Sequence, residues 1–525
     1  MKQNNKIKTI IMISIIIIIQ TIAFIIVGIN KSYIHMDEAY SLGLASYDKV
    51  EIQANEDFYN KWHNKEYYED YLAVNSDEVG EYKQVYENQK NDVHPPLYYL
   101  LLRFAMGFSI DNYSKWPGTI LNIIIYIAIS IFMFLIINKL LEGKDNSVKK
   151  SLFITLVASL TMATLTNVIY IRMYALSALN IVITTYLHLK LLDSKQNNYK
   201  LLFCIMISAL IGSLTHYYYL FYLAMLFIMF VIKYIREKRY KELASYVITM
   251  IIAGALSLAI FPYSIKHMFF GYRGQGAISN LTNISNFINC IIQYVLKINR
   301  FCFNNLLFII ILTIIGILIY KKHSKIKCLE KNKYIIYILL PTLFYFILVA
   351  ISSPWVELRY IMPISGMIFI LVMFYLEETL SNILNEKILN SIIIILSIVM
   401  IVIMPIIYKI EPEVMYSDKK EITSKLENEL NLLTIFLFNS NNNRFLDDIL
   451  LFAKINESYI AKDLECTQEN IKNIMAGKDI SNGMIVFINE GQNNDELLLN
   501  IKNAMELGEI IYLKRLNAGD VYYLK

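Results

Sequence analysis

Long apolar runs recur along most of this chain, and they constrain its fold more than any other feature of the sequence. Eleven runs, each of about 18 to 22 residues, are long enough to cross the roughly 30 Å hydrocarbon core of a bilayer as helices. They lie near residues 8–29, 118–138, 150–170, 174–192, 200–215, 217–234, 243–262, 302–320, 334–352, 360–378 and 389–408. We therefore predict an α-helical polytopic membrane protein.

Two features mark the start of this helical region. Residues 1–29 begin with lysines and continue as an apolar run of about 20 residues, which is longer than a signal-peptide core. No cleavage site of small residues follows it, so we expect it to remain as the first transmembrane helix. The apolar run 95–108 is shorter than the roughly 17 residues that a spanning helix needs. We expect a juxtamembrane half-helix there.

Clusters of lysine and arginine indicate how the helices are oriented. If residues 95–108 do not cross the membrane, these clusters all fall on one side, and cytoplasmic loops carry an excess of such residues. The clusters are Lys2, Lys6 and Lys8; Lys144, Lys149 and Lys150; Lys190 and Lys195; Arg236, Lys238, Arg239 and Lys241; and Lys321, Lys322, Lys325 and Lys327. We predict a multi-pass protein of the cell membrane with a cytoplasmic N-terminus and an extracytoplasmic C-terminus. The loop 377–387 is assigned to the cytoplasm only by counting the preceding crossings, because it has no excess of lysine.

Composition excludes several other classes of protein. With 56% hydrophobic and 18% charged residues, the chain does not have the balance of a soluble protein. The net charge of +5 is small and the lysines lie in short clusters, so we expect no nucleic acid partner. The cysteines show no spacing typical of a disulfide framework or a zinc site. They are Cys204, Cys290, Cys302, Cys328 and Cys466.

The polar parts of the chain form two regions outside the helices. A tyrosine-rich loop covers residues 30–95, and from residue 411 the sequence alternates between strand and helix patterns. We expect strands at 432–438 and 483–489, helices at 444–455 and 495–507, and a hairpin at 510–525. The predicted domains are a helical module, 1–410, whose first extracytoplasmic loop is 30–95, and a small extracytoplasmic α/β domain, 411–525. The small domain has no glycine loop typical of a nucleotide site, which favours a structural or acceptor-binding role.

Two adjacent carboxylates, Asp37 and Glu38, follow the first apolar run. One interpretation is a helix cap at the membrane boundary, where acidic side chains meet water at little cost. The other is a general base at headgroup level, within reach of a lipid-borne substrate. The residues by themselves leave both interpretations open.

A histidine and two prolines, His94, Pro95 and Pro96, stand where a polar loop meets a short apolar run. Proline suits the first turn of a helix. This element is therefore either a rigid membrane re-entry or a site where His94 and the N–H groups of a helix start help to hold a phosphate.

Further cations lie at the predicted outer turns. Arg172 and Arg359 each stand beside apolar runs, where an arginine at membrane depth costs about 2.5 to 3.5 kcal/mol on insertion scales. Each needs an anion, or reaches the headgroups by snorkelling. His216 occupies a similar turn, where a structural role is the alternative, and Tyr272 and Arg273 add a cation on a glycine-bearing loop. Together these residues suit an anionic lipid donor and a sugar.

Through these motifs the chain resembles the GT-C glycosyltransferases, especially the bacterial relatives of protein O-mannosyltransferases and of the aminoarabinose transferase that modifies lipid A. The resemblance covers about residues 1–410 and rests on the order and spacing of short motifs. They are Asp37-Glu38, His94-Pro95-Pro96-Leu97, Arg172 with Tyr174, His216-Tyr217, and Arg359-Tyr360 with Pro363. The tail is not diagnostic of one branch, and the first loop is longer and richer in tyrosine than in many small members.

The resemblance implies a hexosyl- or pentosyltransferase of the bacterial cell envelope. It would move a sugar, with inversion, from a polyprenyl-phosphate donor to an acceptor hydroxyl on the extracytoplasmic face. Asp37 would be the general base, and Glu38 would orient the acceptor or the donor sugar. Donor phosphate and sugar would be bound by His94, Arg172, Tyr174, His216, Arg359 and Tyr360, with Tyr272 and Arg273 as further candidates. We expect no cofactor, and no second acidic pair of the kind that oligosaccharyltransferases use for a divalent metal is found; metal dependence stays open.

Two other functions are compatible with many helices and intramembrane arginines. A lipid or polysaccharide transporter or flippase usually shows internal repeats or discontinuous helices, and the sequence shows no sign of either. An inactive scaffold of envelope-polymer assembly would not need both carboxylates. The acceptor stays open between protein, lipid and polysaccharide, and membrane lipids are expected partners in every case.

Overall fold

The computed structural model describes residues 2–46, 52, 56–282, 287–323, 332–417, 431–438, 444–462, 467–489 and 493–525. The chain forms two compact units. The helical unit consists of Met1–Ile29, Asp92–Tyr98 and Thr119–Glu413. The mixed unit consists of Asn30–Asn91, Tyr99–Gly118 and Val414–Lys525. Most of the first loop and the tail thus belong to one unit, a grouping that the sequence did not indicate.

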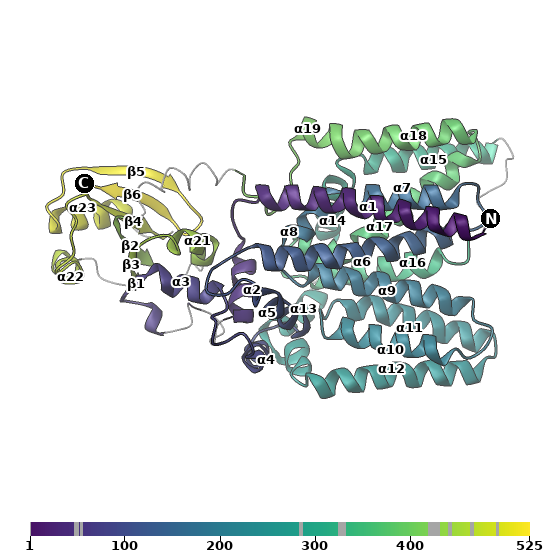
Figure 1. The fold of residues 1–525 in the computed structure, drawn as a ribbon, viewed down its shortest axis with the longest axis horizontal. Coiled ribbons are helices and arrows are strands. Elements are labelled where there is room, and N and C mark those ends of the chain that lie inside the picture. Colours follow the sequence, from purple (N-terminus) through teal and green to yellow (C-terminus); the bar gives the residue numbers. More distant parts are fainter. Residues whose placement is uncertain are drawn as a thin grey trace. The chain divides into compact units, whose positions relative to one another are not determined.

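Long apolar helices form the helical unit, and Figure 1 shows them side by side and roughly parallel. Among the described residues, 7 helices are long and apolar enough to cross a membrane. They are α1 (Lys2–Asn30), α6 (Trp116–Leu140), α9 (Tyr174–Leu192), α11 (Tyr219–Arg236), α12 (Tyr240–Ile260), α17 (Leu358–Ser381), and the run of α18 (Glu386–Ile398), η5 (Val399–Ile403) and α19 (Met404–Tyr408). The shorter α10 (Tyr199–Ser213) and α16 (Ile336–Ser352) occupy two further predicted spans. The predicted helical membrane fold class is confirmed.

Two predicted spans are bent pairs of helices instead of straight ones. Helix α7 (Ser147–Ser159) meets α8 (Met162–Ile169) at 59°, and α14 (Phe287–Phe303) meets α15 (Leu307–His323) at 94°. At the first break, the Thr161 side chain caps α8 by accepting the Thr164 N–H at 3.3 Å. At the second, Asn304 and Asn305 have φ values of 46° and 70°, a left-handed conformation that asparagine tolerates better than most residues. The sequence showed no sign of these discontinuities; the predicted span 302–320 corresponds mainly to α15, and α14 was not predicted.

Short helices lie between the long ones. The helix α5 (Leu97–Met106) has 10 residues and a rise of only about 15 Å, half the thickness of a bilayer core. This length agrees with the half-helix expected at residues 95–108. The loop after α12 contains a π-helical turn, η3 (Lys266–Phe270), and α13 (Tyr272–Thr282).

A six-stranded sheet with the order β1-β3-β2-β4-β6-β5 organises the mixed unit. The strands are β1 (Trp62–Asn64), β2 (Leu433–Phe438), β3 (Glu457–Lys462), β4 (Met484–Ile488), β5 (Ile510–Arg515) and β6 (Asp520–Leu524). Strand β2 pairs in parallel with β3 and β4, and β5 and β6 form the predicted antiparallel hairpin. Strand β1, from the first loop, pairs antiparallel with β3. The sequence predicted β2, β4 and the hairpin but missed β1 and β3.

Helices and aromatic side chains bury both faces of the sheet. On one face, Ile435 and Val486 belong to a core that also includes Ile471 and Ile501 from two helices. On the other face, the Phe436 ring lies 5.6 Å from the ring of Phe452. Besides most of α5, the described helices of this unit are α2 (Met36–Ser46), η2 (Glu56–Phe58), α3 (Lys65–Leu72), α4 (Tyr82–Asn91), η7 (Arg444–Asp448), α21 (Ile449–Phe452), α22 (Gln468–Ile474) and α23 (Asn494–Ala504). The helix expected at 444–455 is split between η7 and α21, and that expected at 495–507 corresponds to α23.

Candidate functional site

The two predicted carboxylates lie in the first turn of α2, in the mixed unit. His35 caps this helix, because its Nδ1 accepts a hydrogen bond from the Asp37 N–H at 3.0 Å. In return, Glu38 Oε2 accepts the His35 N–H at 2.9 Å. This reciprocal arrangement resembles a capping box, and acidic side chains also interact favourably with the positive end of a helix. The helix-cap interpretation therefore applies to Glu38.

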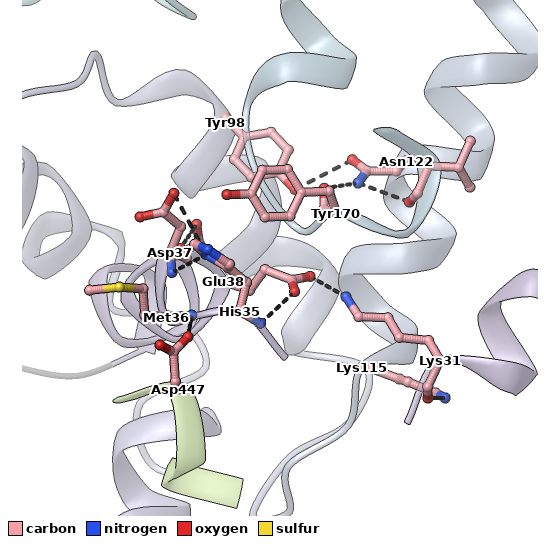
Figure 2. Close-up of polar contacts among 12 residues, drawn as sticks. Lys31, His35, Met36, Asp37, Glu38, Tyr98, Lys115, Asn122, Tyr170 and Asp447 are labelled. Carbon is pink, nitrogen blue, oxygen red and sulfur yellow. Dashed lines mark hydrogen bonds and ion pairs between the residues drawn. The ribbon is translucent and has the colours of Figure 1, made fainter. Parts of the chain in front are cut away.

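Glu38 also forms a buried ion pair with Lys31. The Lys31 Nζ bonds to Glu38 Oε1, and both side chains have an exposed fraction of 0%. Burial lowers the pKa of the Lys31 ammonium, and the Glu38 carboxylate opposes that shift. The Lys31 carbonyl accepts a hydrogen bond from Lys115 Nζ at 2.6 Å. Figure 2 shows this chain of contacts from Lys115 through Lys31 and Glu38 to His35.

Asp37 has a different environment from its neighbour. Its side chain is 17% exposed, so water and dissolved molecules can reach it. Its Oδ2 lies 3.8 Å from His35 Nδ1. This contact is not an ion pair, because a nitrogen that accepts the Asp37 N–H carries no proton. Asp37 is therefore the more exposed carboxylate of the pair.

The predicted phosphate and sugar residues lie in the helical unit, where His94 pairs with Asp92. His94 Nδ1 is 2.8 Å from Asp92 Oδ2, and the side chains are 20% and 19% exposed. Burial opposes ionisation of Asp92, but His94 and Arg172 outweigh it and hold the pKa of that carboxyl below its usual value. An ionised carboxylate only accepts hydrogen bonds, so Nδ1 donates and the orientation of the His94 ring is fixed.

Aromatic rings connect the other predicted residues of this unit. Tyr174 stacks on Tyr170, with ring centroids 6.0 Å apart, and its ring lies 5.4 Å from that of His216 and 6.3 Å from that of Tyr360. The Arg359 guanidinium lies 5.2 Å from the Tyr360 ring centroid, and its Nη1 donates to the Tyr170 hydroxyl at 3.2 Å. The aromatic rings and the guanidinium thus form one contiguous cluster.

Histidines and Arg172 complete this cluster. The rings of His94 and His216 lie 6.3 Å apart. Burial, followed by the charges of His94 and Arg172, lowers the pKa of His216 to about 3. His216 Nδ1 also accepts the Tyr218 N–H at 3.1 Å. His216 is therefore a neutral side chain at pH 7 and supplies no positive charge, whereas the sequence suggested it as a cation.

The loop after α12 holds the last two predicted residues. The Arg273 guanidinium lies 5.1 Å from the Tyr272 ring centroid and 4.6 Å from that of Trp355. Its charge also acts on the hydroxyl of Tyr218, whose ring is 6.0 Å from that of Tyr360. Arg273 therefore lies at the edge of the aromatic cluster.

The sequence motifs did not single out several residues of these clusters. Asp92 stands two residues before His94, and Tyr170 stands two residues before Arg172. This closeness in sequence was the signal that could have identified them. Asn122 donates to the Tyr170 carbonyl at 2.8 Å and accepts from the Tyr98 hydroxyl at 3.3 Å, as Figure 2 shows. No local pattern marked Asn122, because it lies within an otherwise apolar helix.

In the part of the chain that the structure describes, no group of three or more His, Cys, Asp or Glu residues is arranged to hold a metal ion. Cys204, Cys290 and Cys302 are free thiols, and Cys328 and Cys466 lie outside the described residues. The expectation of no cofactor stays a prediction.

Comparisons with known proteins support the fold. No protein-family model and no curated protein sequence matches the chain. Among solved structures, it is similar to the crystal structure of ArnT from Cupriavidus metallidurans bound to undecaprenyl phosphate, with 7% identity, 97% of each chain covered and a TM-score of 0.52. The apo structure of the same ArnT matches with 9% identity, 96% of this chain and 97% of that chain covered, and a TM-score of 0.49. The likeness to the lipid-bound structure shows an ArnT-like fold.

Proposed function

We propose that this chain, a multi-pass membrane protein with the GT-C fold of ArnT, is a glycosyltransferase that moves a sugar from a polyprenyl-phosphate donor to an acceptor hydroxyl. The observation that carries the proposal is the fold match along 97% of both chains to an ArnT crystallised with undecaprenyl phosphate. That lipid is the leaving group of the proposed reaction. Because a fold alone does not determine a reaction, the residues must supply the chemistry.

Asp37 is the general base of the proposed reaction. It takes the proton of the acceptor hydroxyl while the acceptor oxygen bonds to the anomeric carbon of the sugar. The bond between that carbon and the phosphate oxygen breaks, and polyprenyl phosphate leaves with the electron pair, so the anomeric centre is inverted. Support for Asp37 over Glu38 comes from their exposure, since Glu38 is wholly buried against Lys31. General-base catalysis contributes about 10² to 10⁴ in rate.

The helical unit supplies the groups that bind the donor phosphate. Arg172 and Arg359 are the cations proposed for this role, because guanidinium groups form paired hydrogen bonds with phosphate oxygens. His94, oriented by Asp92, is a further donor. Charge on the leaving phosphate grows in the transition state, so these groups stabilise that state more than the bound donor. His216 contributes as a neutral hydrogen-bonding group, and Tyr174 and Tyr360 offer ring faces to the sugar.

The proposed reaction takes place on the extracytoplasmic face. Two ion pairs support the cytoplasmic placement of the loop 377–387, which was assigned only by counting crossings. Lys144 and Lys150, of a lysine cluster assigned to the cytoplasm, both form ion pairs with Glu377 at the end of α17, at 2.9 and 2.8 Å. The end of α17 therefore lies at the same end of the helical unit as this cluster, on the side that the positive-inside rule makes cytoplasmic.

A reporter that is active only outside the cytoplasm should be active when fused after Lys525. The reason is that the tail follows an odd number of crossings from a cytoplasmic start. The same reporter inserted after Asp145, in the lysine-rich loop, should be silent and serves as the matched control. A silent C-terminal fusion that becomes active with a cytoplasmic reporter would reject this topology.

Purified protein should release polyprenyl phosphate from a polyprenyl-phosphate-linked sugar when an acceptor is present. Arg172→Gln and Arg359→Gln should each weaken donor binding by about 10- to 100-fold, which corresponds to the roughly 1.5–3 kcal/mol of a hydrogen bond to a charged group. Arg300→Gln is the matched control, because Arg300 is an exposed arginine at the end of α14. Donor binding is measured by titration and release by separation of the lipid products.

The outcomes of this assay separate the alternative functions. A flippase would move the intact lipid-linked sugar across vesicle membranes without releasing the sugar. The two bent helix pairs make this comparison necessary, because discontinuous helices are common in transporters. An inactive scaffold would give neither release nor movement. Normal donor binding by both folded arginine variants would show that these arginines are structural.

A further inference from the structure

The C-terminal tail holds the first turn of α2. The Met36 N–H, which has no partner within the helix because of its place in the first turn, donates to Asp447 Oδ1 at 2.9 Å. The other carboxylate oxygen of Asp447 accepts Arg444 Nε at 3.1 Å, and the Asp447 side chain is 1% exposed. Figure 2 shows Asp447 directed at the Met36 amide. A buried carboxylate in this position also interacts favourably with the helix dipole.

The same part of the tail holds the segment that precedes α2. The Tyr33 hydroxyl bonds to Asp448, and burial together with this carboxylate raises the pKa of Tyr33 well above its ordinary value, so the hydroxyl remains a donor. Asp448 Oδ2 also accepts the Ala518 N–H, in the turn between β5 and β6, at 2.6 Å. The Ser32 N–H donates to the Met415 carbonyl at 3.2 Å. The tail therefore holds this segment at two successive residues, Ser32 and Tyr33.

A buried guanidinium holds the opposite end of α2. Arg103 Nη1 donates to the carbonyls of Ala45 and Ser46, at 3.1 and 2.9 Å, and Nη2 donates to the Glu78 carbonyl. A cation at the last carbonyls of a helix complements its dipole. Groups of opposite charge thus hold the two ends of α2, and the main chain next to Asp37 is anchored by Asp447.

We propose that Asp447 is a positioning residue that acts through Asp37, so that the tail sets the orientation of the general base without touching the substrate. This inference rests on the proposed function. Met36 is the residue next to Asp37, and loss of its hydrogen bond loosens the turn that carries the carboxylate. Displacement of a reacting group by about 1 Å can cost 10²-fold in rate, so this anchor bears on turnover more than on donor binding.

Asp447→Ala should speed hydrogen exchange at the first amides of α2 by about tenfold to a hundredfold, the factor expected for a lost hydrogen bond to a charged acceptor. It should also lower kcat by about tenfold or more, with the KM for the donor nearly unchanged. Asp447→Asn keeps one acceptor oxygen and should restore most of both properties. Asp495→Ala, at an exposed aspartate in the first turn of α23, is the matched control.

A double-mutant cycle distinguishes positioning from general damage. In an Asp37→Asn background, Asp447→Ala should cause no further loss of turnover, because the group that it positions is already absent. A full additional loss there, or wild-type exchange and turnover in Asp447→Ala alone, would overturn the inference while the transfer activity of the wild-type protein still supported the proposed function. If the wild-type protein transfers no sugar, the proposed function fails, and the Asp447 inference fails with it.

Discussion

Replacing Asp37 by asparagine is expected to lower turnover by about 10² to 10⁴, the contribution typical of a lost general base. Donor affinity and thermal stability should stay near those of the wild-type protein. The substitution removes the basicity and keeps the shape, and the hydrogen bond between residue 37 and His35 comes from the main chain, so the helix cap survives. Single-turnover transfer rates measure the chemical step, and Asp495→Asn is the matched control for removing one carboxylate.

Two results would change this assignment. If Asp37→Asn transfers sugar normally while Glu38→Gln is folded and inactive, the roles of the two carboxylates are exchanged. If the double variant Asp37→Asn with Glu38→Gln is folded and retains normal turnover, neither carboxylate is the base, and the proposed mechanism has to be given up.

The arrangement of helices was largely predictable because its signals are local. Apolar runs of about 20 residues and lysine clusters are each read within a short window of sequence. The bends were not predictable in the same way. A single Thr161 cap and the Asn304-Asn305 pair change the chain direction within hydrophobic stretches, and neither lowers the apolar content enough to be noticed.

The contacts around the acidic pair could not be predicted because they join distant parts of the chain. Asp447 lies 411 residues from Met36, and strand β1 in the first loop pairs with β3 in the tail. No periodic pattern encodes such partners. The ion pair of Lys31 and Glu38 spans only 7 residues, but recognising it required knowledge that both side chains are buried.

In the helical cluster too, part of the site was predictable from the sequence and part was not. The sequence motifs identified residues that the fold brings near one another. They are His94, Arg172, Tyr174, His216, Arg359 and Tyr360. The protonation state of His216 could not be predicted from the sequence, because it depends on burial and on neighbouring cations. Sequence motifs therefore identified residues that lie close together, while the charge state of His216 depends on the packing around it.

Glu38→Gln is expected to destabilise the protein by about 3–5 kcal/mol, the usual cost of leaving one partner of a buried ion pair without the other. Lys31→Met should have an effect of similar size, since it leaves the Glu38 carboxylate buried without its cation. Lys31→Met combined with Glu38→Leu should be more stable than either single variant, because an apolar pair of similar volume avoids the buried charge. Thermal unfolding of the purified proteins in detergent, at matched protein concentration, measures the three differences.

The same measurements decide between the two interpretations of the acidic pair. If Glu38→Gln loses stability and the double variant Lys31→Met with Glu38→Leu recovers it, Glu38 acts by holding the start of α2. The recovered double variant should then keep much of its turnover, because Asp37 is unchanged. If Glu38→Gln is as stable as the wild-type protein but no longer binds the donor, Glu38 contacts the substrate. That result would contradict the structural role that its burial against Lys31 indicates.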